Sequence, residues 1–368
     1  MIFRVDYLIY IYIALCMCIL LFDFYYMLKM NRLKKQEPKK TERYVKHMLP
    51  MLDSEIQQMS KREQRYWVRR LRKYSKLLIF NEAVEQIASE EQGKSRIKKW
   101  LWINRELFLK ISDSYTKGNQ RIKKAFFAYI VWQYELCGKE ETDFFVQLMY
   151  QLCMEPSLYC RENALCGLYK SGSAENVVKA YQLLGRQGIE HSSRLVTDGL
   201  LMFSGNHNEL ADALWKHKNE FSVSYQIAFI NYIRMTSGEF GERFFPILVE
   251  ADIENEVRFA VIRYYRRYYY GDAAPILQAM VRDWKNEDWE FASIAALALD
   301  NYPGDESAQA LLEGCRSGQW HVRENAAESL LNILEPDKIC QSIEQESDYF
   351  AKDILTYKWS RKQEEAAI

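Results

Sequence analysis

The chain has 368 residues, of which 48% are apolar and 27% charged, a balance typical of folded domains and not of disordered segments. Seven prolines and 15 glycines are few for this length, which argues against a β-rich fold with many tight turns. The chain is also too long for one small core, unless it is an array of repeats that pack on their neighbours. An all-α fold is therefore predicted.

The formal net charge is zero, but the charge is unevenly distributed. Residues 29–76 contain 16 Lys and Arg against 5 Asp and Glu, a local charge of +11. Residues 1–28 carry −1, so residues 77–368 carry −10. A body with this balance lacks the wide basic surface that a long nucleic acid requires, and we expect no nucleic acid as a partner.

The first predicted element follows a short tail at residues 1–6. The stretch YLIYIYIALCMCILLFDFYYML, residues 7–28, is apolar except for Asp23 and exceeds the roughly 20 residues that a helix needs to cross a bilayer. Bulky residues stand where a cleavable signal peptide requires small ones. A single transmembrane helix is predicted over 7–28. Asp23 lies either at the headgroup level or opposite a polar group of a partner membrane protein.

Residues 29–50 are predicted to be a basic juxtamembrane linker. Its first cations are Lys29, Arg32, Lys34, Lys35, Lys39 and Lys40. Because positive charge stays on the cytoplasmic side, we expect a single-pass protein of the cell membrane with its N-terminus outside and its C-terminal domain in the cytoplasm. Topology alone does not explain the arginines at 62, 65, 69, 70 and 72, which are expected to lie along an anionic bilayer or to contact an acidic partner.

Residues 51–118 are predicted to form a helical N-terminal cap region. In YWVRRLRKYSKLL, residues 66–78, apolar side chains follow helical spacing and the opposite face is basic. The stretch KKWLWINRELFLKI, residues 98–111, is expected to be one further helix.

An internal repeat follows. Arg-Glu-Asn-Ala begins at Arg161 and again at Arg323, and the 162 residues between them divide into five periods averaging 32.4. Steps of 32 or 33 residues reach apolar, helix-like runs, and we call the six residues the index positions: Arg161, Arg194, Gln226, Arg258, Phe291 and Arg323.

Fourteen residues after each index position the sequence forms a turn, and a second apolar helix follows. These turn positions are Glu175, Asn208, Phe240, Asp272, Asp305 and Asp337. Acidic residues there suit a helix N-terminus. We predict helix–turn–helix repeats with a period of about 32 over 119–348, and a C-terminal capping helix and tail at 349–368.

The pattern resembles the HEAT repeat family, through Val257-Arg258-Phe259-Ala260, Val322-Arg323-Glu324-Asn325-Ala326 and the aspartates that open the second helices. The resemblance implies an α-solenoid with a ladder of ion pairs between index arginines and turn carboxylates. Carried over, the ladder comprises Arg161, Arg194, Arg258, Arg323, Glu175, Asp272, Asp305 and Asp337. Gln226 and Phe291 depart from the family pattern, so the ladder is expected to be interrupted there.

No motif for catalysis or cofactor binding is found. The sequence contains no P-loop, no GxGxxG and no GxSxG. No two histidines are four residues apart, and the eight cysteines form no CxxC pair, so a metal site is not expected. We predict no catalytic, cofactor-binding or metal-ligating residue.

The segment RYYRRYYYG, residues 263–271, has the most unusual local composition. On a helix, Arg263, Arg266, Arg267 and Tyr270 project away from the apolar face. Three interpretations remain: the solvated edge of a repeat, a protein-binding patch, or a nucleic-acid contact. Tyr and Arg are favoured anchors of protein interfaces, and we assign these four residues to partner binding.

The sequence thus favours a membrane-anchored scaffold or adaptor that binds a membrane-associated protein partner and is not an enzyme. By analogy with other membrane-anchored HEAT proteins, an envelope-polysaccharide glycosyltransferase system is the favoured setting. One alternative is a HEAT-like enzyme of the DNA glycosylase type, acting through the Tyr/Arg segment. Another is a lyase-like chaperone for a chromophore, with Cys160 and Cys166 as the reactive groups.

Overall fold

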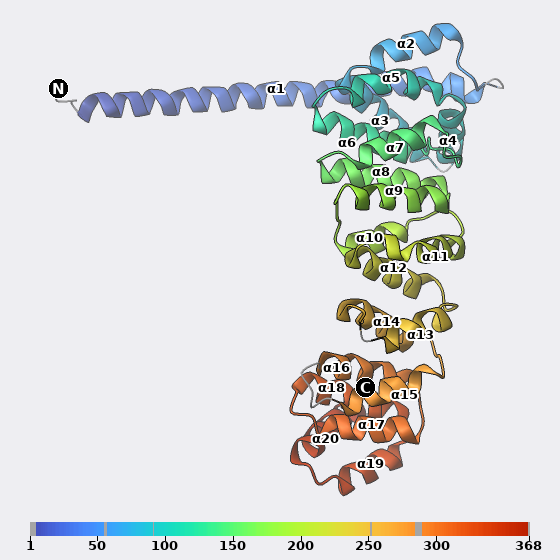
Figure 1. The fold of residues 1–368 in the computed structure, drawn as a ribbon. Coiled ribbons are helices and arrows are strands. Elements are labelled where there is room, and N and C mark those ends of the chain that lie inside the picture. The colour runs from blue at the N-terminus through green and yellow to red at the C-terminus, as the bar shows by residue number, and fades with distance from the viewer. Residues whose placement is uncertain (1–4, 55–56, 91, 251, 284–288, 367–368) are drawn as a thin grey trace. The chain divides into compact units, whose positions relative to one another are not determined.

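The computed structural model describes residues 5–54, 57–90, 92–250, 252–283 and 289–366 (Figure 1). In these residues the regular elements are all helices, which confirms the all-α prediction. The chain divides into two compact units, Met1–Gly167 and Leu168–Ile368, and the boundary falls within helix α8.

The helices of the first unit follow one another with short connections. They are α1 (Val5–Asp53), α2 (Lys61–Leu71), α3 (Tyr74–Ala88), α4 (Gly93–Ile103), α5 (Glu106–Thr116), α6 (Arg121–Gln133), α7 (Phe144–Cys153) and α8 (Leu158–Ser171).

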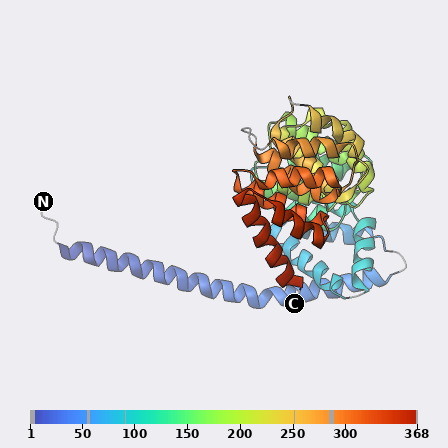
Figure 2. The ribbon, with the colours of Figure 1, turned by 90° about the horizontal axis from the view of Figure 1, so that it is seen from below.

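Helix α1 includes both the predicted transmembrane segment 7–28 and the predicted linker 29–50. The C-terminal end of α1 is held by packing, because Tyr44, Met48 and Leu52, spaced at i, i+4 and i+8, are buried where α1 contacts α3 and α4. Figure 2 shows the N-terminal part of α1 running away from these helices.

Most side chains of the segment 7–28 lie outside the described residues, as do those of Asp23 and of residues 29–37. A search confined to the described residues found no helix that combines the length and the apolar character of a membrane span.

The stretch 98–111, predicted to be one helix, is instead the end of α4 and the start of α5. Asn104 explains the break. Its Nδ2 donates to the carbonyl oxygens of Trp100 (2.9 Å) and Gln57 (2.8 Å), and its Oδ1 accepts from the Met59 N–H (2.8 Å). The side-chain amide thus ends α4 and fastens the preceding loop, a local competition with helix bonding that apolar periodicity does not reveal.

The second unit is built of helix hairpins. After α8 come α9 (Ala174–Arg186), α10 (Ser193–Leu200), α11 (His207–Lys216), η1 (Lys218–Glu220), α12 (Val223–Thr236), α13 (Gly241–Val249), α14 (Asn255–Arg267), α15 (Ala273–Arg282), α16 (Trp289–Ala298), η2 (Leu299–Asn301), α17 (Asp305–Cys315), α18 (Trp320–Ile333), α19 (Pro336–Gln345) and α20 (Tyr349–Ala366).

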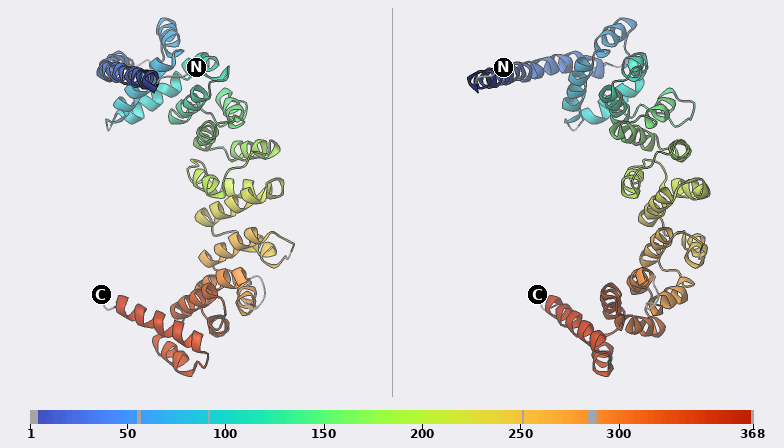
Figure 3. Two further views of the ribbon diagram at one scale, coloured as in Figure 1. Left: turned by 90° about the vertical axis from the view of Figure 1, so that its left-hand side faces the viewer. Right: turned by 60° about the vertical axis from the view of Figure 1, so that its left-hand side comes forward.

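Successive hairpins stack in a solenoid-like manner (Figure 3). The first helices form one row, in which α10, α12, α14, α16, α18 and α20 each pack on the next. Second helices form another row, including α13, α15 and α17. All six index positions lie in the first turn of a first helix, as the period predicts.

The two Arg-Glu-Asn-Ala copies use their arginines in the same way. Arg161 Nη1 donates to the carbonyl oxygens of Glu155 and Pro156, both at 3.0 Å. Arg323 Nη1 donates to the Ser317 carbonyl oxygen at 2.6 Å. In each copy the guanidinium therefore satisfies a main-chain acceptor in the loop that leads into its own helix.

The asparagines of the two copies also have equivalent partners. Asn163 Nδ2 donates to the carbonyl oxygen of Ala125 on α6 (3.0 Å), and Asn325 Nδ2 donates to that of Ser293 on α16 (3.1 Å). Both acceptors lie on the first helix of the preceding hairpin. The following alanines, Ala164 and Ala326, are fully buried. The tetrapeptide thus marks one structural position, where a small residue permits close packing and an amide links neighbouring helices.

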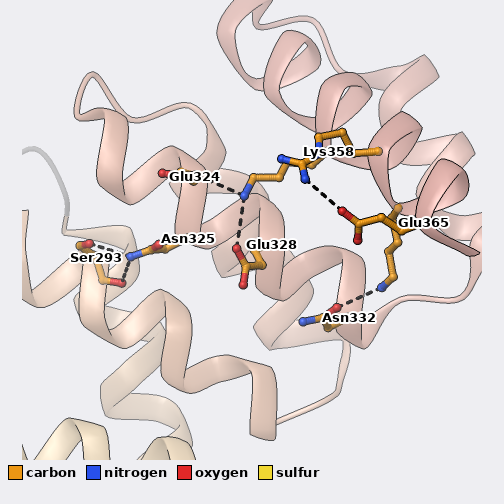
Figure 4. A network of polar contacts seen from close by, with 9 residues as sticks. Ser293, Glu324, Asn325, Glu328, Asn332, Lys358 and Glu365 are labelled. Atoms are coloured by element: carbon orange, nitrogen blue, oxygen red, sulfur yellow. Dashed lines mark hydrogen bonds and ion pairs between the residues drawn. The ribbon is translucent and has the colours of Figure 1, made fainter.

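The last helix, α20, is tied to α18 by charged side chains (Figure 4). Lys358 Nζ lies 3.3 Å from Glu324 Oε1 and 3.2 Å from Glu328 Oε2, and the lysine side chain is only 19% exposed. Lys362 Nζ donates to the Leu331 carbonyl oxygen at 2.7 Å. This helix covers the apolar end of the stack, as a terminal cap must.

We expect Asn325→Ala to destabilise the second unit by about 1–2 kcal/mol, because the substitution removes the part-buried amide that links α18 to α16. Asn332→Ala, on the exposed side of the same helix, is the matched control and should cost less than about 0.5 kcal/mol. Urea unfolding of the two variants followed by circular dichroism measures the difference. Equal midpoints would show that the amide link does not contribute.

Candidate partner-binding surface

Helix α14 separates a buried face from a basic one. Val257, Val261, Tyr264 and Tyr265 are buried. The segment assigned to partner binding lies at the C-terminal end of this helix and just beyond it: Arg266 and Arg267 are exposed, while Arg263 and Tyr270 are half-buried. The structure thus brings the four predicted residues to one end of one hairpin.

The buried tyrosines hold this end of the helix in place. Tyr264 Oη accepts a hydrogen bond from the Phe240 N–H at 2.9 Å, and Tyr265 Oη donates to the Gly241 carbonyl oxygen at 2.6 Å. Burial raises the pKa of Tyr264 to about 12, so its hydroxyl is neutral at physiological pH. These tyrosines position the arginines and have no access to a ligand.

A fourth arginine, on the neighbouring helix, joins the three of α14. Arg234 belongs to the last turn of α12 and is half-buried. Its pKa is lowered by burial first and then by the positive charges of Arg263, Arg267 and Arg266. The two helices are in direct contact, since Arg267 Nη1 lies 3.3 Å from Sδ of Met235, the residue that follows Arg234.

Sequence reasoning missed Arg234, although the repeat contained the signal. Residues 234 and 266 are 32 positions apart, one period, so both occupy the same place in successive first helices. We call Arg234, Arg263, Arg266 and Arg267 the arginine cluster.

The predicted ladder arginines have varied surroundings. Arg258 Nη2 donates to the Leu248 carbonyl oxygen at 3.3 Å, and its guanidinium carbon lies 4.4 Å from the centre of the Phe291 ring. Arg194 is 92% exposed, with its Nε 3.8 Å from Asp198 Oδ2. Gln226 performs the task of an index arginine, since its Nε2 donates to the Phe221 carbonyl oxygen at 3.0 Å. Loop carbonyls are thus a recurrent partner of the index position.

The ladder carboxylates all lie at the start of second helices. Asp272 is the N-cap residue of α15, Asp305 is the first residue of α17, and Glu175 and Asp337 are the second residues of α9 and α19. There they face the positive end of the helix dipole. Their pairing with the index arginines stays a prediction.

The membrane-proximal cations can be placed only in part. The side chains of Lys29, Arg32, Lys34 and Lys35 lie outside the described residues, Lys39 is exposed and Lys40 is half-buried. Downstream, α2 begins with a capping box at Ser60 and buries Trp67 and Leu71. Its other face forms a groove of about 430 Å³ lined by Lys61, Gln64, Arg65, Val68, Arg69, Arg72 and Lys110.

The cysteines considered for covalent chemistry differ in access. Cys160 is fully buried, and burial raises the pKa of its thiol to about 12. Cys166 is half-buried on the same helix, whereas Cys340 on α19 is exposed. In the described part of the chain, no three His, Cys, Asp or Glu side chains are grouped as metal ligands would be.

No protein-family model matches the chain, and no curated protein matches it. Among solved structures, a crystal structure of an engineered protein from the Northeast Structural Genomics Consortium aligns with 86% of this chain and 97% of its own. The two are 14% identical, with a TM-score of 0.33. A match at this level assigns neither a family nor an activity.

We expect Cys160 to resist alkylation by iodoacetamide in the native protein, because burial raises the pKa of its thiol to about 12 and encloses the sulfur, so little reactive thiolate is present at pH 8. Cys340 should react readily and serves as the internal control. Mass spectrometry of peptides after brief labelling gives both rates. Rapid labelling of Cys160 would restore the chromophore-lyase interpretation.

Proposed function

We propose that this protein is a membrane-anchored, HEAT-like α-solenoid that acts as a scaffold and binds a protein partner at the cytoplasmic face of the cell membrane. One observation carries the proposal: stacked hairpins bring arginines together at the ends of the adjacent first helices α12 and α14, two of them exposed, on a support of buried tyrosines. Surfaces of this composition suit protein interfaces.

The anchor in this proposal is the segment 7–28. Its described side chains support a lipid-facing role, because Leu15, Ile19, Leu20, Leu21 and Phe22 are each more than half exposed. Consecutive residues of a helix point in different directions, so this exposure covers all sides of the helix. Such a surface is unfavourable in water and favourable in hydrocarbon.

The basic face of α2 is proposed to lie against anionic headgroups. Its groove presents four cations, Lys61, Arg65, Arg69 and Arg72, beside Lys110. Each Lys or Arg close to an anionic leaflet contributes about 1 kcal/mol of attraction. Together with the cations of residues 29–40, this face would hold the first unit near the bilayer.

The scaffold needs no catalytic group, and we propose none. A partner in an envelope-polysaccharide glycosyltransferase system remains the favoured setting, on fold analogy alone. The DNA glycosylase interpretation is the competing outcome, and the arginine cluster would then contact phosphates.

The proposed topology predicts that Cys340, exposed on α19, is labelled by a membrane-impermeant maleimide only after cells are permeabilised. A Phe3→Cys variant supplies the opposite control, since a cysteine there should react in intact cells. Mass spectrometry identifies the labelled site. Labelling of Cys340 in intact cells would place the second unit outside and contradict the proposal.

A photo-crosslinking residue at position 266 should capture one stoichiometric partner in membranes, because Arg266 is exposed within the arginine cluster. The same residue at position 309, exposed on α17, is the matched control and should capture far less. Mass spectrometry of the adduct gives the partner. Equal, diffuse adducts at both positions would argue against a scaffold, and release of a damaged base by the purified protein would favour the glycosylase.

A further inference from the structure

We propose that the arginine cluster, together with an adjacent row of exposed apolar side chains, binds a short acidic peptide segment of the partner that also carries apolar residues. This inference rests on the proposed function and specifies the chemistry of the partner.

The cluster concentrates positive charge without compensation. Arg234, Arg263, Arg266 and Arg267 belong to adjacent helices, and in the described residues none of them forms an ion pair with a carboxylate. Arg267 donates to a thioether sulfur, which is a weak acceptor. Arg234 Nε is buried and has no hydrogen-bond partner in the described part of the chain. An anion would supply acceptors for Arg266 and Arg267, whose side chains are exposed.

Helix dipoles account for only part of this arrangement. Arg234, Arg266 and Arg267 lie in the last turns of α12 and α14, where the carbonyl ends attract cations. Each helix end is equivalent to roughly half a negative charge, so two ends offset about one of the four positive charges. Mutual repulsion therefore persists, and after burial it is the second cause that lowers the pKa of Arg234. A bound carboxylate would relieve it and accept paired bonds from a guanidinium.

Apolar side chains indicate that the anion belongs to a peptide. Met202, Met235 and Tyr269 lie at or just beyond the ends of α10, α12 and α14, and they are 39%, 45% and 67% exposed. They are 33 and 34 residues apart, close to one period, so they lie near the same end of three consecutive first helices. We call them the apolar row. Met235 contacts Arg267, which joins the row to the cluster.

The charge of the chain and the apolar row argue against two other classes of ligand, free inorganic anions and long polyanions. A free inorganic anion would gain nothing from the apolar row, and a long polyanion would be repelled by a body that carries −10 over residues 77–368. A short segment with alternating carboxylates and apolar side chains engages both features, and flexible methionines adapt to such segments.

The probe is a fluorescein-labelled peptide, LEELEELEEL, titrated with the full-length protein in nanodiscs of neutral lipid and followed by fluorescence polarisation. Arg234→Gln/Arg266→Gln/Arg267→Gln should weaken binding by roughly 10-fold or more. The matched control, Arg186→Gln/Lys216→Gln/Lys338→Gln, removes the same charge from exposed positions on the second helices α9, α11 and α19 and should leave binding within about 2-fold. Circular dichroism and urea midpoints verify that both variants fold.

Met235→Ser/Tyr269→Ser tests the apolar row. This variant should have a lower affinity for LEELEELEEL and an unchanged affinity for hexaglutamate. The uncharged peptide LQQLQQLQQL should bind neither the wild-type protein nor the variant. Equal affinity of both triple variants for the acidic peptide would overturn the proposal. So would displacement of the peptide by inorganic pyrophosphate or by phosphatidylglycerol vesicles at equivalent anion concentration, because either outcome would reveal a general anion site.

Failure of this inference can be told apart from failure of the scaffold. If a specific partner is crosslinked but the arginine triple variant binds the peptide as tightly as the wild-type protein, the scaffold proposal stands and this binding site is rejected. If the peptide binds tightly and requires the arginine cluster, but no partner is crosslinked, the binding site stands and the scaffold proposal is rejected.

Discussion

Each hairpin of the second unit depends on its neighbours to cover its apolar side. Fully buried alanines, such as Ala260, Ala295 and Ala326, let successive first helices approach closely, and a side-chain amide such as that of Asn325 reaches the carbonyl of the helix before it. No helix in such a row is stable by itself. The ends must consequently be closed, and α20 closes one of them through Lys358 and its two glutamates.

Stacking at a constant period also determines which side chains are neighbours on the surface. Residues one period apart come to lie side by side, so a side chain at the end of one first helix is next to its counterpart in the following helix. This is how Arg234 meets the arginines of α14, and why Met202, Met235 and Tyr269 lie near the same end of three consecutive first helices. Neither feature belongs to one hairpin. A binding surface in this architecture is a property of the repeat, and buried tyrosines that bond to the preceding turn keep it in register.

The helix pairs and their register were predictable because apolar periodicity is local and the period is nearly constant. What the polar side chains contact was less predictable. Index arginines bond to loop carbonyls, and a loop carbonyl leaves no trace in the sequence. The duplicated tetrapeptide indicates that Asn163 and Asn325 are equivalent, but it does not indicate that each donates to a carbonyl oxygen of the preceding first helix. Asn104 divides a periodic stretch by bonding main-chain groups that precede it by 45 or more residues, beyond any local pattern.

The selectivity proposed for the arginine cluster has an electrostatic basis. At physiological ionic strength charges interact over about 8 Å, so a ligand responds to the few side chains near it and not to the net charge of the chain. Four guanidiniums in a body of charge −10 are then a local attraction within a generally repulsive surface. A ligand longer than the cluster meets repulsion beyond it, whereas one that fits within two or three hairpins does not. The same contrast separates the cluster from the basic residues 29–76, whose extended charge suits the proposed role at a membrane surface. The two basic regions are therefore proposed to have different partners.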